Sequence, residues 1–450
     1  MNITSNPLCG NVLQVGRFKL PKNENTRGKL ARPTSSWSYT TFRRLTSSFF
    51  LLLFTTSIYA QSLNDYIQYA YENNPSLKAA YTKFEIALQK IPQVKTLPNP
   101  QLSFGYFISP VETRLGPQQA RISLNQQFPW FGTLKAKGEV ATLEADMAYQ
   151  VFLEEKNRLA YEVKKAYYPL IEIQEQIELL QKNLVILNTY KSLTTQSFSN
   201  GKGTLADALR VGMLIEEEEV SLQLLNDRIR PLEIAFNRLI NRGDSLAVKL
   251  EAPVSVTTAT FTNLKDSIRA RHPKLAAWTL KEQAAKAQEL VEQKKALPSF
   301  GIGLDYALVG NRTDANPTDN GRDILMPMVS LSLPIAKKRN QAARKVTQLN
   351  QLASQTNRAA IENELMVEYE LHHYEMTKAV RMNALYAKQL KQTQQIIDLL
   401  LTEYSHSGKD FEEVLRMQQQ LLQYHMAKAT VEKEYQLALA KLAYLTVQLD

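Results

Sequence analysis

Hydrophobic residues occupy every second position in four short segments of the chain. In the first, residues 100–108, Leu102, Phe104 and Tyr106 share one face, and small or polar residues such as Ser103 occupy the other. This period of two is typical of a β-strand. Three further segments show the same alternation: 120–128, 299–308 and 325–334. Each is roughly nine or ten residues long, which is the length that crosses a bilayer when the strand is tilted. A half-buried sheet of a water-soluble protein would show the same alternation, so the pattern alone leaves both interpretations open.

The segments that follow the strands repeat apolar residues at intervals of four and three. The longest run consists of Leu159, Val163, Ala166, Leu170, Ile173, Ile177, Leu180, Leu184 and Leu187. Such a repeat is typical of helices that pair as coiled coils. It predicts one helix from about Gly132 to Phe198, roughly 100 Å long. A second run over 222–239 follows a Gly-Lys turn and predicts an antiparallel partner helix. Pro169 lies inside the long run and predicts a bend or an interruption there.

The chain contains two copies of one pattern. Four landmarks recur in the same order: Asn74-Pro75 and His272-Pro273, Leu97-Pro98 and Leu297-Pro298, Gln127 to Trp130 and Ser332 to Ile335, and Ser199 to Lys202 and His406 to Lys409. Each copy predicts a helix, two strands, a very long helix, a turn and another helix. We therefore expect a mainly α protein with membrane β-strands, built as a first repeat at 61–262 and a second repeat at 263–450.

Residues 1–60 predict an N-terminal extension with an export signal peptide. Residues 43–60 place two arginines before an apolar run that ends at Ala60, whose small side chain suits signal-peptidase cleavage. The run is shorter than the about 20 apolar residues of a membrane-spanning helix. The single cysteine, Cys9, precedes the expected cleavage site. The exported chain is therefore expected to contain neither a disulfide nor a thiol nucleophile.

The distribution of charge argues against a nucleic-acid partner. The chain carries 54 Lys and Arg against 44 Asp and Glu, a formal net charge of +10. Eight of these basic residues and one of the acids lie in the first sixty residues, so residues 61–450 keep 46 and 43, a net charge of +3. So small an excess is too little for a surface that follows phosphates. The exported part also lacks a phosphate-binding loop and a nucleophile elbow, so neither an enzyme nor a bound cofactor is expected.

The number of strands limits how a membrane sheet could close. Lipid cannot satisfy the polar groups of an open sheet edge, so a sheet that crosses a membrane must form a barrel. The smallest known barrels have eight strands, and this chain predicts four. Several chains must therefore share one barrel. Three chains would give twelve strands, and their long helices would continue the barrel as a hollow tube.

These features together resemble the TolC family of outer-membrane efflux proteins. The resemblance rests on the duplicated layout, on Phe128-Pro129-Trp130-Phe131-Gly132 after the second strand and on Phe198-x-x-Gly201 followed by Asp207-Ala208-Leu209. It implies a homotrimer with a twelve-stranded barrel in the outer membrane of a Gram-negative bacterium and a helical barrel in the periplasm. It also implies a periplasmic adaptor protein and an inner-membrane pump as partners, with passive conduction through the channel. Heavy metals and drugs are the expected cargo, and protein secretion is less favoured.

The same resemblance implies a pore gate just beyond the two turns. The matching acidic positions are Asp207 in the first repeat and Glu413 in the second. The family often has a second acid three residues later, whereas this chain has Arg416. An acid next to a base could form an ion pair between subunits in place of a cation-binding ring. A solvated helix face is the alternative for these residues.

Two further groups of residues follow from the expected topology. The turns at the periplasmic tip contain Gly201, Lys202, Gly203, Gly408 and Lys409, which either contact an adaptor or only reverse the chain. Trp130 and Phe131 join a strand to a helix. Amphipathic rings at that point suit the interface with outer-membrane lipid, and ordinary packing is the alternative.

Two alternative functions have less support. His372 and His373 could offer metal ligands on one helix together with Glu368, but a third well-placed histidine is missing, so no metal site is expected. An exported coiled-coil scaffold without channel activity would explain the heptads and the duplication. It would not explain four strands of membrane length that each have one apolar face.

Overall fold

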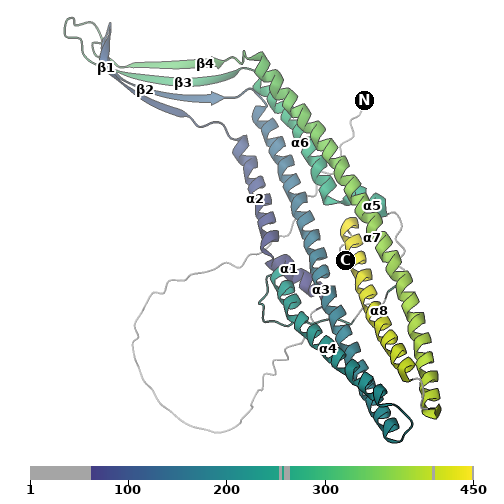
Figure 1. The fold of residues 1–450 in the computed structure, drawn as a ribbon. Coiled ribbons are helices and arrows are strands. Elements are labelled where there is room, and N and C mark those ends of the chain that lie inside the picture. Colours follow the sequence, from purple (N-terminus) through teal and green to yellow (C-terminus); the bar gives the residue numbers. More distant parts are fainter. Residues whose placement is uncertain (1–61, 253–255, 258–263, 408–410, 448–450) are drawn as a thin grey trace, which may run out of the picture. The chain divides into compact units, whose positions relative to one another are not determined.

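The structure is a computed structural model that describes residues 62–252, 256–257, 264–407 and 411–447. The predicted export signal at 1–60 lies outside the described residues, as do Gly408 and Lys409. The first half of the described chain forms α1 (Leu63–Asn73), α2 (Pro75–Lys95), β1 (Gln101–Thr113), β2 (Gly116–Phe128), α3 (Thr133–Ser199) and α4 (Leu205–Leu239). The second half forms α5 (Leu264–Arg271), α6 (Pro273–Lys295), β3 (Ser299–Val309), β4 (Ile324–Ser332), α7 (Lys337–Ser407) and α8 (Phe411–Thr446) (Figure 1). The order of helices and strands is therefore the same in both halves.

The longest predicted helix is found almost as expected. Helix α3 has 67 residues and differs by one residue at each end from the predicted range. It continues through Pro169, so the proline does not interrupt it. Tyr167 and Leu170 on either side are buried, and this packing holds the helix together where one backbone hydrogen bond is lost.

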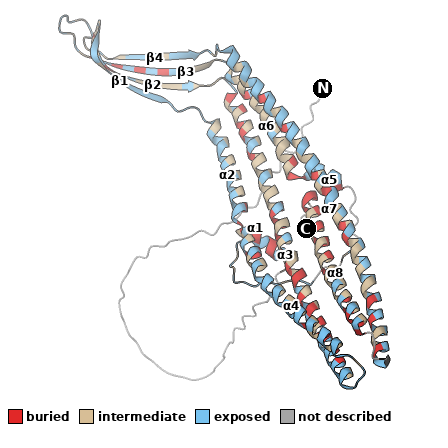
Figure 2. Ribbon diagram, in the orientation of Figure 1, coloured by how far each residue is buried: buried red, intermediate tan, exposed pale blue. Residues whose placement is uncertain are grey.

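The heptad positions of α3 form much of the protein's interior. Leu159, Val163, Leu170, Ile173, Ile177, Leu180 and Leu187 are all buried (Figure 2). Helix α3 contacts α2, α4, α6 and α8, while α7 contacts α6 and α8. The antiparallel pairing of α3 with α4 that the heptads predict is present. Burial of this apolar stripe is the main stabilising contribution to the helical part.

The four strands form one antiparallel sheet in the order β1-β2-β3-β4. All four lie where the period of two predicts them, but two are several residues longer than predicted. Strand β1 continues five residues further, to Thr113, across a bulge between Tyr106 and Val111, and β2 begins four residues earlier, at Gly116. In an antiparallel sheet the start of β1, the end of β2, the start of β3 and the end of β4 lie at the same end. The four junctions between helix and strand therefore share one end of the sheet (Figure 1).

Candidate functional site

One face of the sheet carries apolar side chains on all four strands. The pairing register aligns two apolar rows across the sheet, Phe104, Ile122, Tyr306 and Leu325, and Leu102, Leu124, Leu304 and Pro327. These side chains are largely exposed within the chain, and Val329 on the same face is 83% exposed. So large an apolar surface is unfavourable in water and indicates contact with lipid or protein.

Over β1, β2 and β3 the opposite face is mostly polar or small, whereas β4 places Ile324, Met326 and Met328 on it. Ser103, Ser123 and Asp305 lie side by side across three strands. The guanidinium of Arg121, on the same face, forms an ion pair with Asp305, which is only 2% exposed. Gly303 leaves room for its neighbours, because a Cβ atom there would lie 2.1 Å from Oδ1 of Asn125. The sheet thus has one apolar face and one face that is polar on β1, β2 and β3, as expected of membrane strands next to an aqueous lumen.

Both edges of the sheet are unpaired within the described chain. Strand β1 pairs only with β2, and β4 pairs only with β3. Each outer strand therefore presents backbone N–H and C=O groups that no strand of the described chain satisfies. Such edges pair with further strands when no water is available.

The turn between α3 and α4 is built by backbone hydrogen bonds. Gly201 has a φ of +70°, a left-handed conformation that favours glycine. The carbonyl oxygen of Ser197 accepts hydrogen bonds from the N–H groups of Lys202 and Gly203 at 2.9 and 3.2 Å. A Cβ atom on Gly203 would lie 3.3 Å from the hydroxyl of Tyr404, so this turn lies close to the last turns of α7.

Asp207, predicted at the gate, caps α4. Its carboxylate accepts hydrogen bonds from the N–H and the hydroxyl of Thr204, and its own N–H donates to the Thr204 hydroxyl. This reciprocal arrangement is a capping box. The sequence Thr204-Leu205-Ala206-Asp207 carries the local signal for this motif.

Glu413 and Arg416, the other two predicted gate residues, pair with each other within α8. The Arg416 guanidinium hydrogen-bonds the Glu413 carboxylate and lowers the pKa of Glu413 below its ordinary value. A second ion pair joins the two halves, because Nη1 of Arg210 in α4 lies 2.5 Å from Oε2 of Glu412 in α8. Sequence reasoning missed this pair, since the residues are 202 positions apart.

An apolar cluster lies near these charged residues, at the end of the helices that carries the turn between α3 and α4. Its buried members come from α3, α4, α7 and α8, and are Leu187, Tyr190, Val211, Ile215, Tyr404, Phe411, Val414 and Leu415. Below it, the Gln418 amide donates a hydrogen bond of 2.8 Å to Oδ1 of Asn183, and both side chains are buried. A buried polar pair of this kind favours one register between two helices.

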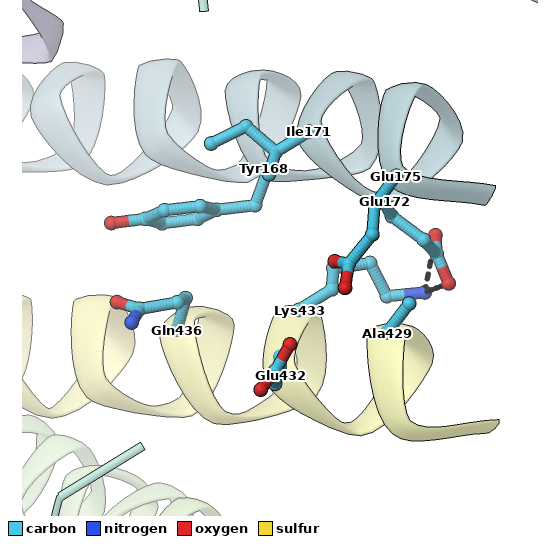
Figure 3. A pocket seen from close by; sticks show the side chains of 8 residues that line it. All are labelled: Tyr168, Ile171, Glu172, Glu175, Ala429, Glu432, Lys433 and Gln436. Atoms are coloured by element: carbon cyan, nitrogen blue, oxygen red, sulfur yellow. Dashed lines mark hydrogen bonds and ion pairs between the residues drawn. The ribbon is translucent and has the colours of Figure 1, made fainter. Parts of the chain in front are cut away.

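Helices α3 and α8 also meet at a small polar pocket (Figure 3). It is lined by Tyr168, Ile171, Glu172, Glu175, Ala429, Glu432, Lys433 and Gln436. The ammonium of Lys433 lies 3.0 Å from both carboxylate oxygens of Glu172. Burial, and the nearby Glu432 carboxylate, raise the pKa of Glu175. The ion pair is satisfied within the pocket, so it joins the two helices and leaves no open site.

Aromatic rings gather where β2 ends. Phe128 and Phe300 stack with ring centres 5.4 Å apart, and Phe131 lies 5.8 Å from Phe300. Trp130 packs against Phe131 at 6.0 Å, and Phe131 itself is 71% exposed. The two residues predicted at a membrane interface are thus in contact, and Phe131 keeps most of its surface exposed.

The two histidines of α7 contact side chains of their own helix. Nδ1 of His372 lies 2.8 Å from a carboxylate oxygen of Glu375, and His373 packs against Tyr369. Among the described residues, no group of three His, Cys, Asp or Glu side chains is arranged to hold a metal ion. In the same part of the chain, no helix is long and apolar enough to cross a bilayer.

Comparison with known proteins assigns the chain to a family. The outer membrane efflux protein family matches residues 66–241 and again 264–446, which together cover most of the chain and all the described helices and strands except the first residues of α1. The chain belongs to the outer membrane efflux protein family. Members of this family are channels and not enzymes, so this outer membrane efflux protein is a channel of the outer membrane of Gram-negative bacteria, with a part that extends into the periplasm.

Individual relatives agree with this assignment. The alkaline protease secretion protein AprF of Pseudomonas aeruginosa is 26% identical over 305 residues, 61% of this chain, and the match spans 60% of the length of that relative. The outer membrane protein VceC of Vibrio cholerae has a TM-score of 0.70 and 17% identity over 85% of this chain and 95% of that chain. The open state of the MtrE outer membrane channel of Neisseria gonorrhoeae has a TM-score of 0.69 and 17% identity over 85% and 88%. Both structures share the fold of this outer membrane efflux protein.

Proposed function

We propose that this outer membrane efflux protein is the exit duct of a tripartite export system and works as a homotrimer. The sheets of three copies join edge to edge into a barrel of twelve strands, with β4 of one copy beside β1 of the next. The helices of the two repeats, 61–262 and 263–450, continue the duct into the periplasm. An inner-membrane pump supplies the energy, a periplasmic adaptor joins pump and duct, and the channel conducts passively.

The sheet is the observation that carries this proposal. Its two faces differ as those of a membrane strand do, and both of its edges are unpaired within the described chain. Joining three copies satisfies every edge and places Asp305 and Arg121 in the lumen. The rival scaffold without channel activity would leave the exposed apolar rows without a partner.

Two neighbouring positions on opposite faces of β1 test the barrel. Phe104→Arg puts a charge on the apolar face, where arginine costs about 2–4 kcal/mol at the bilayer midplane. Ser103→Arg puts the same charge on the polar face and is the matched control. We expect Phe104→Arg to abolish the trimer in outer-membrane fractions, and Ser103→Arg to assemble and conduct less in a planar bilayer. Equal assembly of the two variants would exclude a barrel with this orientation.

The proposed gate lies at the tip. Glu413 and Arg416 of each copy surround the narrowest point of the closed duct, and Asp207 fixes the start of α4 beside them. The pair Arg210–Glu412 links the two helical hairpins, which supports a closed tip in this conformation. Opening the duct separates the hairpins and breaks this link.

The remaining predicted residues have roles at the two boundaries of the duct. Gly201, Lys202, Gly203, Gly408 and Lys409 form the tip that the adaptor contacts. Trp130 and Phe131 lie at the interface with outer-membrane lipid, which the exposure of Phe131 supports.

The cargo follows from the pump. Metal ions and drugs remain candidates, and the name of the AprF relative, which refers to secretion of a protease, adds polypeptides. Deleting the gene and measuring the resistance of cells to metals and drugs, together with their secreted proteins, separates these cargo classes.

A further inference from the structure

The four helix ends that adjoin the sheet are strongly basic. In these helices, the two helical turns nearest the sheet are 89–95 of α2, 133–139 of α3, 289–295 of α6 and 337–343 of α7. Together they contain nine Lys or Arg and three Glu, a net charge of +6. Residues 61–450 carry only +3 in total, so the rest of that range is net negative. Because the four junctions share one end of the sheet, these basic residues form a belt at that end.

The belt is not neutralised by the acids near it. Two of its three glutamates already have partners, because Lys295 lies 2.8 Å from Glu292 and Arg344 lies 3.6 Å from Glu289. Lys337, Lys338 and Arg339 begin α7 and are exposed, and they form no ion pair with an acid in the described part of the chain.

Two lysines of the belt, Lys95 and Lys294, lie against the start of α3. The side chain of Lys95 lies across the start of α3, where a Cβ atom on Gly138 would be 2.3 Å from Cε of Lys95. A Cβ atom on Gly132 would lie 3.6 Å from Nζ of Lys294. The belt thus continues from α7 across α6 and α3 to α2.

An apolar band separates the belt from the strands. The linkers 96–100, 129–132, 296–298 and 333–336 contain no charged residue. Ile335 is 87% exposed, Phe131 71% and Leu333 59%. Apolar and aromatic side chains next to a run of Lys and Arg are typical of a surface that lies at the headgroup level of an anionic membrane.

We infer that this belt binds the anionic headgroups of phospholipids in the leaflet that faces the periplasm. The inference rests on the proposed crossing of the membrane by the sheet. The apolar band lies at the level of the acyl chains, and the basic side chains lie one or two turns further, at the level of the phosphates. The turns at the other end of the sheet, 114–115 and 310–323, contain three Arg and three Asp and carry no net charge, so the attraction acts at one leaflet only.

The test compares two variants of α7 that lose the same charge. The belt variant is Lys337→Gln, Lys338→Gln and Arg339→Gln. The control variant is Arg381→Gln, Lys388→Gln and Lys391→Gln, which are exposed on the same helix about twelve to fifteen turns away. Each purified protein is reconstituted in equal parts of phosphatidylcholine and phosphatidylglycerol and extracted again, and the retained lipids are quantified. Trimer formation and conductance are measured on the same samples.

We expect wild type and control variant to retain an excess of phosphatidylglycerol over phosphatidylcholine. The excess retained by the belt variant should be about tenfold smaller, and the difference between the variants should shrink at high salt. Equal excess in all three proteins, or no excess in wild type, overturns the lipid site. Loss of the trimer only in the belt variant shows that the belt contacts a neighbouring copy and also overturns it. Absence of trimer and conductance in wild type instead refutes the proposed duct, so the two failures are distinguishable.

Discussion

Asn74 and His272 cap equivalent helices in the two halves, α2 and α6, each directly before a proline. Oδ1 of Asn74 accepts a hydrogen bond from the N–H of Leu77 at 3.0 Å, and Nδ1 of His272 accepts one from the N–H of Lys274 at 3.3 Å. Both caps are buried. The asparagine side chain does not titrate. The histidine can gain a proton on Nδ1, but it then no longer accepts the hydrogen bond from Lys274. Of these two equivalent caps, only the one on α6 can titrate.

The stability of the protein should fall on mild acidification because of His272. Burial, and then the charges of Lys274 and Lys441, lower the pKa of His272 from 6.5 to about 4. A group whose folded-state pKa is lowered contributes stability above its unfolded pKa, and this contribution is lost as the pH falls towards the folded pKa. Between pH 6.5 and 4 we expect a loss of up to roughly 3 kcal/mol in the free energy of unfolding. Circular dichroism melts across this range measure it.

The variant His272→Asn isolates this effect because it copies the cap of the first half. It should melt near wild type at neutral pH and lose less stability on acidification. Glu154 faces His272 at 3.9 Å, and burial raises its pKa. Its protonation therefore stabilises the fold as the pH falls, which opposes the effect of His272, but it does so in wild type and variant alike. An identical pH dependence of wild type and variant would assign the acid sensitivity to other groups.

Two glycines near the tip should respond oppositely to alanine. Gly201 has a φ of +70°, so Gly201→Ala should destabilise the hairpin by about 1 kcal/mol. Gly212 lies inside α4, and a Cβ atom there meets no atom within 4 Å. Gly212→Ala should therefore stabilise the helix by about 0.5–1 kcal/mol. Thermal melts of the two variants check the signs, and stabilisation by Gly201→Ala would refute the left-handed turn.

Local periodicity predicted most of the fold. The 3.5-residue repeat located α3 to within one residue at each end, and the period of two located all four strands. The continuation of β1 to Thr113 could not be seen, because a bulge between Tyr106 and Val111 disrupts the alternation. The apolar positions predicted for the four strands also lie on one face of the sheet. Each strand alternates apolar and polar residues, and the pairing register brings the apolar residues of neighbouring strands next to each other.

Contacts between the two halves could not be predicted from the sequence. Arg121 with Asp305 and Arg210 with Glu412 are each separated by more than 180 residues, and nothing in the local pattern of either residue marks its partner. The duplication indicated only that the two turns are equivalent. The distances between their side chains depend on how α4 and α8 pack, which no local pattern encodes.

Reversing one charge at the tip should loosen the closed state. Arg210→Glu places like charges together and should increase the conductance of single channels in a planar bilayer. The double variant Arg210→Glu, Glu412→Arg restores the pair and should return the conductance towards wild type. The effect on thermal stability should stay below about 1 kcal/mol, because both side chains are exposed.

Arg228→Glu is the control for this experiment, since it makes the same change on an exposed position of α4 further from the turn. It should leave the conductance unchanged. If it opens the channel as much as Arg210→Glu does, the net charge of α4 and not the link to Glu412 holds the tip closed.

The last prediction concerns the ion pair of the polar sheet face. If three sheets close into a barrel, three Arg121–Asp305 pairs lie in its lumen and their charges cancel. Asp305→Asn leaves three uncompensated guanidinium groups and should shift the reversal potential in a salt gradient towards anion selectivity. Arg121→Gln leaves a buried carboxylate without its partner, so it should shift selectivity towards cations and reduce stability. The double variant should resemble wild type in selectivity, because neither charge remains. Unchanged reversal potentials in both single variants would mean that these side chains do not line the conducting path, and would require the opposite assignment of the two sheet faces.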